Sequence, residues 1–386
     1  MGELERFLSC RLNSRISPIS FIQLVRTNWN DRLKGLLKAI VIQVIINIKS
    51  KVMEKIKEIT ESIGIDVSKS TLDIFIHTKR LHKQFLNNKK GFAEVLKFVK
   101  KEVKDMNQTI WCFEHTGWYC ILLSHFMYIN KLHYCCVNPM EIKRSMGLKR
   151  SKTDKQDAEE IARYAWLRRN ELSPSIPMPL NLVELQRLMS LREQLVKQST
   201  ALKNLNKGLK VTVEKENSDF GMRAIKQTLK QLENQIKKVE KEMIRLIKQE
   251  GEMYHNFKMS KSVKGVGDVM AIQMLLHTHN YTRFGTWREF SSYCGLVPYP
   301  YQSGTSINRK PKTHSVSDQK MKSLLTMSAI SAIQADKELK QYFKKRVEQG
   351  KPKMVVLNII RNKIVSRIFA TVKRGTPYVE MYKFAA

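Results

Sequence analysis

The sequence predicts an α/β N-terminal domain, a helical coiled-coil connector and a mainly α-helical C-terminal domain. Short β-branched runs alternate with helical stretches over residues 61–180, and heptad-like spacing follows in residues 181–255. Residues 256–386 are again helical in pattern, around one irregular loop at 295–317. A chain of 386 residues is too long for one ordinary domain and suits two or three.

The first part of the chain changes character near residue 61. Residues 1–60 form a basic extension with a helical pattern and no chemistry that the residue types identify. Residues 63–67 are a short β-branched run, and 71–77 alternate apolar and polar with the period of a half-buried strand. Residues 82–86 are expected to supply a third strand.

Helices and strands then alternate along the chain. The patterns predict a helix at 91–103, a strand at 109–113, a helix at 118–128 and a strand at 132–137. Asn138 and Pro139 mark a turn before another helix. The order β-β-β-α-β-α-β-α is that of an RNase H-like domain, in which helices flank a mixed sheet.

The predicted connector is dense in Lys, Glu and Gln. Its apolar residues are spaced 3-4-3-4-3, as in a coiled-coil seam: Leu229, Leu232, Ile236, Val239, Met243 and Leu246. The seam is shorter than three heptads, so an antiparallel hairpin within one chain and a coil between two chains remain equally open. Either arrangement indicates an interaction scaffold.

The charge of the chain indicates a polyanionic partner. Lys and Arg number 69 against 35 Asp and Glu, a formal net charge of +34. Neutralising phosphates releases counterions, which favours binding of nucleic acid by so basic a protein. A generally basic proteome is the other reading of this composition.

The cysteines and the apolar runs indicate a cytoplasmic protein. None of the six cysteines forms a C-x-x-C pair, so they read as reduced thiols, mostly in apolar surroundings. The longest apolar stretch, 36–48, is interrupted by polar residues and is too short to span a bilayer. No transmembrane helix and no cleavable signal are expected.

Four carboxylates are placed to meet in the predicted fold. Asp66 lies in the first strand, and Glu114 ends a strand expected to be its neighbour. Asp154 and Asp157 share one face at the start of a helix, because they are three residues apart. Such a cluster repels itself unless divalent cations bind it. We therefore expect two Mg²⁺ ions, held about 4 Å apart for in-line phosphoryl displacement.

Each of these acids also has a simpler explanation. A single Asp after a strand is often a turn residue, and an Asp pair at a helix start often stabilises the helix dipole. Only the combination, with each acid on the expected element of one fold, favours metal binding. Gly64 and Gly117 leave room for a close backbone or nucleic-acid approach. Three further residues have two possible roles each. His115 either contacts substrate or is a packing or capping residue. Lys69 and Lys152 either contact phosphate or are solvated charges.

The C-terminal part carries two further motifs. Gly265 and Gly267 resemble the turn of a helix-hairpin-helix, whose amides can meet a phosphate. In the loop, Ser303 precedes Gly304 and can expose its hydroxyl on a tight turn. Basic side chains able to steady a phosphate follow it: Lys310, Lys312 and His314. A serine in a polar loop is usually inert, so its role as a nucleophile depends on other context.

Together these segments resemble a transposase of the insertion-sequence-110 family. The resemblance covers 61–382 and rests on the order of several short motifs: 63–66 (IGID), 114–117 (EHTG), 152–158 (KTDKQDA), 265–267 (GVG), 295–298 (GLVP) and 302–304 (QSG). The C-terminal Tyr342, Gly350, 361–363 (RNK) and 375–378 (GTPY) are also similar to the family's ending. No single motif decides the matter, but their order and spacing are specific.

The resemblance implies a RuvC-like DEDD domain, a coiled-coil connector and a transposase domain with a catalytic serine. The four acids correspond to Asp66, Glu114, Asp154 and Asp157, which would hold Mg²⁺, and the serine corresponds to Ser303. In the family, the serine attacks a DNA phosphate and forms a covalent phosphoserine link. The resemblance further implies a structured guide RNA from the element, DNA ends and target as substrates, and a dimer or tetramer in a nucleoid-associated bacterial protein.

Two features depart from the family's pattern. Members generally begin shortly before the first Asp strand, and 53–58 (MEKIKE) resembles such a start, so residues 1–52 are expected to be dispensable. The neighbours Thr305 and Ser306 also carry hydroxyls, but Gly304 follows Ser303 as in the family.

Two other functions fit part of the sequence. A RuvC-like junction nuclease would use the same acids with water as nucleophile and would leave Ser303 structural. A non-enzymatic RNA-binding scaffold would use only the helices and the basic charge. Neither explains the acids and the serine loop together.

Overall fold

The computed structural model describes residues 58–145, 147, 153–211, 220–304, 307–314 and 316–379. The chain forms two compact units, of which the first ends at Pro177 and the second begins at Met178. The predicted N-terminal extension therefore lies almost wholly outside the described residues, as do Lys152, Thr305 and Ser306.

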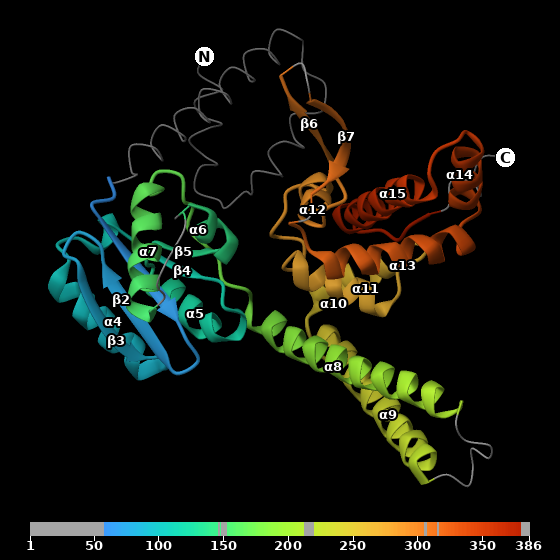
Figure 1. Cartoon of the computed structure of the whole chain (residues 1–386), viewed down its shortest axis with the longest axis horizontal. Helices are drawn as coiled ribbons and strands as arrows, with labels where there is room; N and C mark the ends of the chain where they lie inside the picture. Colours follow the sequence, from blue (N-terminus) through green and yellow to red (C-terminus); the bar gives the residue numbers. More distant parts are fainter. Residues whose placement is uncertain are drawn as a thin grey trace, which may run out of the picture. The chain divides into compact units, whose positions relative to one another are not determined.

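The first unit is built on a mixed five-stranded sheet with the strand order β3-β2-β1-β4-β5 (Figure 1). β1 pairs antiparallel with β2 and parallel with β4, β2 pairs antiparallel with β3, and β4 pairs parallel with β5. The strands are β1 (Glu61–Val67), β2 (Thr71–Ile76), β3 (Leu81–Leu86), β4 (Thr109–Glu114) and β5 (Tyr134–Val137). The predicted order of strands and helices is confirmed.

Four α-helices accompany this sheet: α4 (Lys89–Glu102), α5 (Ile121–Ile129), α6 (Pro139–Ser145) and α7 (Asp154–Leu167). α5 begins later than predicted because Gly117–Cys120 forms a 3-10 turn, which Gly117 enters with φ of 69°. α4 begins at Lys89, two residues before the predicted start, since the Asn88 side chain accepts a hydrogen bond from the Gly91 amide at 2.9 Å and caps the helix.

The two faces of the sheet are covered by different helices. Successive side chains of a strand point to opposite faces. On one face, Ile63 and Ile65 belong to the same buried cluster as Phe92 of α4 and Leu123 of α5. On the other, the cluster of the sheet side chains Ile110 and Cys112 includes Ile161 and Ala165 of α7. α7 is thus the helix that covers the second face.

Gly64 explains how closely α7 approaches β1. A Cβ added at Gly64 would lie 2.1 Å from the Ala158 carbonyl oxygen and 2.3 Å from the Ala162 nitrogen. Beside it, the Ser62 hydroxyl donates to the Ala162 carbonyl at 2.9 Å. The predicted role of Gly64 in a close backbone approach therefore holds for α7 itself. Gly117 has open space around its Cα.

The second unit begins with two long helices, α8 (Leu180–Leu209) and α9 (Phe220–Gln249), which pack side by side as an antiparallel hairpin (Figure 1). Val239 and Met243 of the predicted seam are buried, and the other seam residues are half-buried. An ion pair across the hairpin joins the Arg192 Nε and Glu240 Oε1 atoms at 2.7 Å. The seam thus packs within one chain, and a coil between chains stays a prediction.

The remaining helices share one core with this hairpin. Leu185 of α8 and Met243 of α9 belong to the same cluster as the buried residues of the C-terminal helices. These helices are α10 (Gly251–Lys261), α11 (Asp268–His277), α12 (Trp287–Tyr293), α13 (Gln319–Ala335), α14 (Lys337–Glu348) and α15 (Lys353–Arg374). The predicted connector is therefore continuous with the C-terminal helices, and does not form a compact unit of its own.

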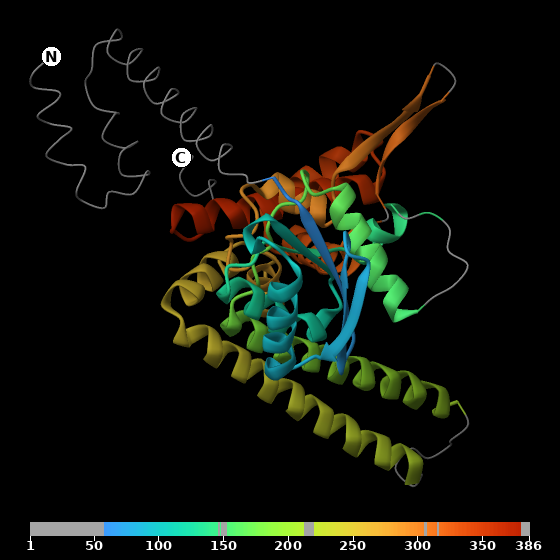
Figure 2. The same cartoon turned by 90° about the vertical axis from the view of Figure 1, so that its left-hand side faces the viewer.

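The predicted irregular loop at 295–317 is mostly regular, and this expectation was wrong. It forms a two-stranded antiparallel hairpin of β6 (Pro298–Ser303) and β7 (Ile307–Thr313), which projects from the helices of its unit (Figure 2). Its register shifts between Tyr299 and Tyr301, at Pro300. Proline has no amide hydrogen for a ladder, so it is tolerated at such an irregularity.

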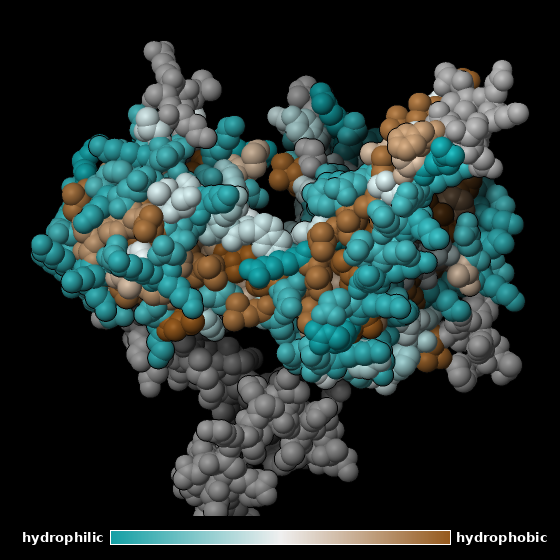
Figure 3. All heavy atoms as spheres, turned by 90° about the horizontal axis from the view of Figure 1, so that it is seen from below, coloured by the Kyte–Doolittle hydropathy of each residue, from teal (hydrophilic) through white to brown (hydrophobic). Residues whose placement is uncertain are grey.

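On the face seen in Figure 3, hydrophilic residues predominate and hydrophobic residues are exposed among them. Within the described ranges, every helix is too short or too polar to span a bilayer. The five described cysteines are free thiols, as predicted: Cys112, Cys120, Cys135, Cys136 and Cys294.

Candidate functional site

Asp66 and Glu114 lie side by side on the sheet. The parallel register of β1 and β4 pairs Ile65 with Phe113, so these two acids occupy the next position of the same ladder. Each follows by two residues a position that faces α7, namely Gly64 and Cys112. Because side chains alternate along a strand, both carboxylates point to the face that α7 covers.

α7 brings the other two acids to this face. The helix begins at Asp154, and the Thr153 hydroxyl caps it by accepting from the Gln156 amide at 3.3 Å. Asp154 is exposed and Asp157 is half-buried, both in the first turn. The sequence prediction for the strand or helix that carries each acid is therefore confirmed.

The raised pKa of Asp66 indicates that the other acids lie near it. Burial, first, and then the negative charges of nearby carboxylates together raise the pKa of its carboxyl from an ordinary 3.8 to about 6. The charges that contribute are, in order, those of Asp157, Asp154, Glu114 and Asp73. Like charges disfavour ionisation of a carboxyl in this way only when they are close. The four acids thus converge on Asp66 as an acidic cluster.

Carboxylate oxygens are the ligands that Mg²⁺ prefers, so the chemistry of this cluster fits a divalent cation. The spacing is looser than a closed site: among the described residues, which include all four acids, no three His, Cys, Asp or Glu side chains are grouped tightly enough to hold a metal ion. Mutual repulsion of carboxylates opposes closer approach without a cation between them. The metal site therefore stays a prediction.

Ser303 lies in the second unit, at the tip of the β6–β7 hairpin. It is the last residue of β6, is exposed, and pairs in register with Ile307. Gly304 follows with φ of 56°, in the left-handed region that favours glycine. The predicted exposed hydroxyl before a tight turn agrees with this geometry.

The hairpin register also identifies a basic residue that the sequence analysis missed. Tyr301 pairs with Arg309, and both share the face of Ser303 because strand side chains alternate. The Arg309 guanidinium carbon lies 5.4 Å from the centre of the Tyr301 ring, so a cation–π contact holds it. Lys310 falls on the opposite face, whereas Lys312 lies beyond the register shift, opposite Tyr299. Recognising the strands in the sequence would have separated Arg309 from Lys310.

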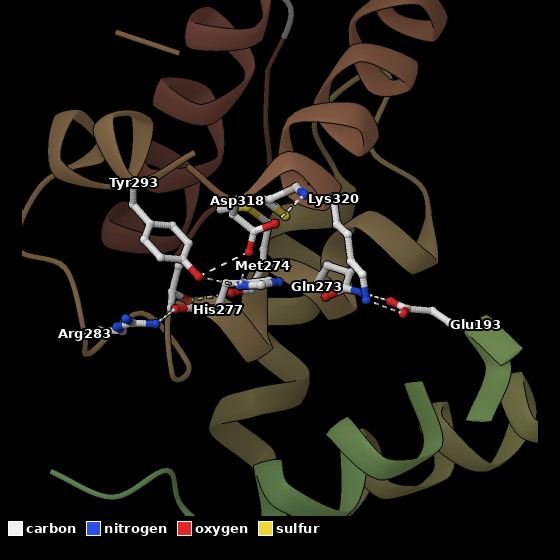
Figure 4. Close-up of polar contacts among 10 residues, drawn as sticks. Glu193, Gln273, Met274, His277, Arg283, Tyr293, Asp318 and Lys320 are labelled. Carbon is white, nitrogen blue, oxygen red and sulfur yellow. Dashed lines mark hydrogen bonds and ion pairs between the residues drawn. The ribbon is translucent and has the colours of Figure 1, made fainter. Parts of the chain in front are cut away.

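A polar network fixes the base of the hairpin (Figure 4). The Tyr293 hydroxyl, before β6, donates to Asp318 Oδ2, after β7, at 3.2 Å. His277 Nδ1 of α11 lies 3.4 Å from the same carboxylate oxygen, and burial lowers the pKa of this imidazole. Asp318 also caps α13 by accepting from the Met321 amide at 2.9 Å. The hairpin is therefore anchored at its base while its tip is exposed.

The other predicted contact residues are distributed as follows. Gly265 has φ of 85° and lies against α13, since an added Cβ would be 2.4 Å from the Ser328 carbonyl oxygen. Its role in this structure is helix packing, whereas Gly267 has open space. His115 and Lys69 are exposed in the first unit. His314 accepts a hydrogen bond from the Val316 amide at 3.0 Å, just after β7.

Comparison with known proteins identifies the family of the chain. A family model described as a transposase, of the IS110 DEDD type, matches residues 63–210. A second, described as "Transposase IS116/IS110/IS902 family", matches residues 258–344. This chain belongs to the IS110 family of transposases. The two matches of this IS110-family transposase contain all four acids and Ser303, respectively.

Relatives of the transposase extend over most of its length. The pilin gene-inverting protein of Moraxella bovis is 28% identical over 324 residues, which is 82% of this chain and 97% of the relative. That of Moraxella lacunata is 27% identical over the same length. An uncharacterized 43.6 kDa protein of insertion element IS110 from Streptomyces coelicolor is 29% identical over 117 residues, 30% of this chain and 29% of the relative. The family is thus one of transposases and recombinases that act on DNA.

Proposed function

We propose that this IS110-family transposase cleaves and exchanges DNA strands by metal-dependent phosphoryl transfer through a covalent phosphoserine intermediate. Asp66, Glu114, Asp154 and Asp157 hold two Mg²⁺ ions, and Ser303 is the nucleophile. The observation that carries the proposal is the convergence of these acids on Asp66, whose pKa rises to about 6 through burial and the four neighbouring negative charges, that of Asp73 included. A carboxyl in that position gains most from a cation that offsets those charges.

The sheet and α7 would hold the acids in position around the cations. Asp66 and Glu114 are fixed by the β1–β4 ladder, and Asp157 by the first turn of α7. Bound cations would supply charge stabilisation for the attacking and leaving oxygens of the displacement. The cluster is open on the side of the exposed Asp154, which supports entry of a DNA backbone there.

Ser303 would attack the phosphorus of a DNA phosphodiester. Its hydroxyl loses a proton, the new oxygen–phosphorus bond forms, and the sugar oxygen leaves and is protonated. The exposed tip favours access of the hydroxyl to a duplex. Arg309, held by Tyr301 on the same face, would neutralise charge on the phosphate.

The partners follow from the charge and the family. A net charge of +34 supports simultaneous binding of DNA and a structured guide RNA from the element. The α8–α9 hairpin exposes Leu191, Val196 and Leu205, which supports a dimer or tetramer in which one chain's acids act with another chain's serine.

A denaturing gel tests the proposal. The native chain, Mg²⁺, the element's ends and the flanking RNA should give a covalent protein–DNA adduct that Ser303→Ala abolishes. Thr305→Ala and Ser306→Ala are the matched controls and should both keep the adduct. If Ser303→Ala still forms the adduct and one of the two control variants does not, the nucleophile is the residue substituted in that control.

The same gel distinguishes the competing functions. Cleavage without an adduct, unchanged in Ser303→Ala, would make the protein a junction nuclease that uses water. Unchanged biological activity in Asp66→Asn would leave a nucleic-acid-binding scaffold, in which the acids are incidental.

A further inference from the structure

A fifth carboxylate, Asp73, lies beside the four acids. In the antiparallel register of β1 and β2, Asp73 is the direct partner of Asp66. Directly opposite side chains point to the same face, with Cβ atoms about 5 Å apart. On the other side of Asp73, its partner in β3 is Gln84. Gln84, Asp73, Asp66 and Glu114 therefore form one polar row across four strands, on the face that α7 covers.

Asp73 is buried and is held by two side chains of β3. Its side chain is buried, with 3% of the residue exposed. His82 Nε2 lies 2.8 Å from its Oδ1 atom, and Gln84 Nε2 donates to Oδ1 at 3.3 Å and to Oδ2 at 3.0 Å. His82 and Gln84 both belong to β3 and are two residues apart, so they share this face.

These contacts limit what Asp73 can do. An ionised carboxylate accepts about four hydrogen bonds, and His82 and Gln84 already make three contacts with it. Direct coordination of a cation would compete with them. One remaining acceptor position, however, suits the hydrogen of a water molecule bound to a cation at Asp66. Carboxylates in this outer position orient metal-bound groups and tune metal affinity.

We infer that Asp73 acts as an outer carboxylate of the divalent-cation site, contacting the metal through water, and that His82 and Gln84 orient it. This inference rests on the proposed metal site at Asp66. Asp73 is a positioning residue and not a ligand. The inference also gives a role to the half-buried histidine and the glutamine of β3, which both contact Asp73.

Titration of the full-length chain with Mn²⁺ alone, followed by calorimetry without nucleic acid, tests the inference. Asp73→Asn keeps the shape of the side chain but lowers its charge, and should weaken Mn²⁺ binding about tenfold or more. His82→Gln, which changes a partly exposed residue, should weaken binding in the same direction by a smaller factor. Glu102→Gln is the matched control, because Glu102 pairs with Lys79 at 2.9 Å outside the row. It should bind Mn²⁺ as the native chain does.

Asp66→Asn separates this inference from the proposed function. If Asp66→Asn loses Mn²⁺ binding while Asp73→Asn and His82→Gln both bind like the native chain, the outer role is wrong and the metal site stands. If Asp66→Asn itself binds like the native chain, both are wrong. Thermal melting without metal identifies a purely structural role: a lowered Tm in Asp73→Asn with unchanged Mn²⁺ affinity of the folded protein would overturn the inference. If Asp73→Asn does not fold, the Mn²⁺ affinity of His82→Gln alone tests the inference.

Discussion

At the scale of single residues, Asp66 has an unfavourable electrostatic position for a carboxylate. Its carboxyl is partly buried and faces the charges of Asp157, Asp154, Glu114 and Asp73. The fold can tolerate such a group because burial of the surrounding apolar side chains outweighs the cost of one charge. Positions of this kind are typical of functional sites.

The pH dependence of stability should show this cost. The folded-state pKa of Asp66 is raised from 3.8 to about 6, so the unfolded chain loses the proton more readily. Ionisation of Asp66 therefore destabilises the metal-free fold as pH rises through this window. Asp66→Asn should raise the Tm at pH 7.5 in a chelator, and the gain should vanish below about pH 4. An equal or lower Tm at pH 7.5 would contradict this account.

Arg309 should matter for the serine chemistry, and Lys310 should not. Arg309→Ala removes the guanidinium on the face of Ser303, so the rate of adduct formation should fall at least about tenfold. Lys310→Ala removes a neighbouring charge from the opposite face and serves as the control. Equal losses in the two variants would indicate that net charge, and not position, is what the hairpin supplies.

The sequence predicted Asp66, Glu114, Asp154 and Asp157 on the correct elements because each acid adjoins a clear strand or helix signal. Asp73 was not recognised, since a buried polar residue in an alternating strand has no signal of its own. Its position beside Asp66 depends on the register of β1 and β2, which sequence patterns do not specify.

At the scale of elements, the contact between β1 and α7 decides whether the acids meet. Gly64 lets the helix backbone lie against the strand, and no other residue leaves that space. The motif around Asp66 thus supplies both the carboxylate and, in Gly64, the space that α7 needs to pack against β1.

Substitution of Gly64 should break this contact. Gly64→Ala places a Cβ 2.1 Å from the Ala158 carbonyl oxygen, so α7 must move away. We expect a loss of about 1–3 kcal/mol or more in the free energy of unfolding, measured with denaturant, and weaker Mn²⁺ binding. Gly208→Ala is the control, because nothing lies within 4 Å of that position in α8. Unchanged stability of Gly64→Ala would mean that α7 packs less closely than the structure has it.

The β6–β7 hairpin was the element that sequence patterns concealed. Two prolines, Pro298 and Pro300, and the register shift beside Tyr301 hide the alternation that marks a strand. The exposed hairpin buries little, so no apolar face revealed it. For α8 and α9, the sequence left a hairpin within one chain and a coil between two chains equally open. A seam this short does not show whether its partner helix belongs to the same chain or to another.

At the scale of the whole molecule, the acids belong to one compact unit and Ser303 to the other. Each unit has its own buried core, so each can hold its part of the chemistry in place by itself. The family matches cover both parts: residues 63–210 run from the first unit into the second, and residues 258–344 lie within the second.

The net charge of +34 should dominate binding to DNA of arbitrary sequence. We expect the affinity for such a duplex, measured by fluorescence anisotropy, to fall about 10³-fold or more between roughly 50 and 200 mM salt. Asp66→Asn should follow the same salt dependence, because it changes no cationic contact. An affinity that hardly depends on salt would show that the charge serves another purpose.

The pairing of β1 with β4 has a consequence for the order in which the protein is synthesised. β1, with Asp66, leaves the ribosome early, whereas its neighbour β4 follows only after β2, β3 and α4. The covering helix α7 follows later still, after α5, β5 and α6. Domains generally fold as units once their whole sequence has emerged. A nascent chain therefore carries its first acid long before it can assemble a cluster, and a truncated translation product that ends before α7 lacks Asp154 and Asp157 altogether.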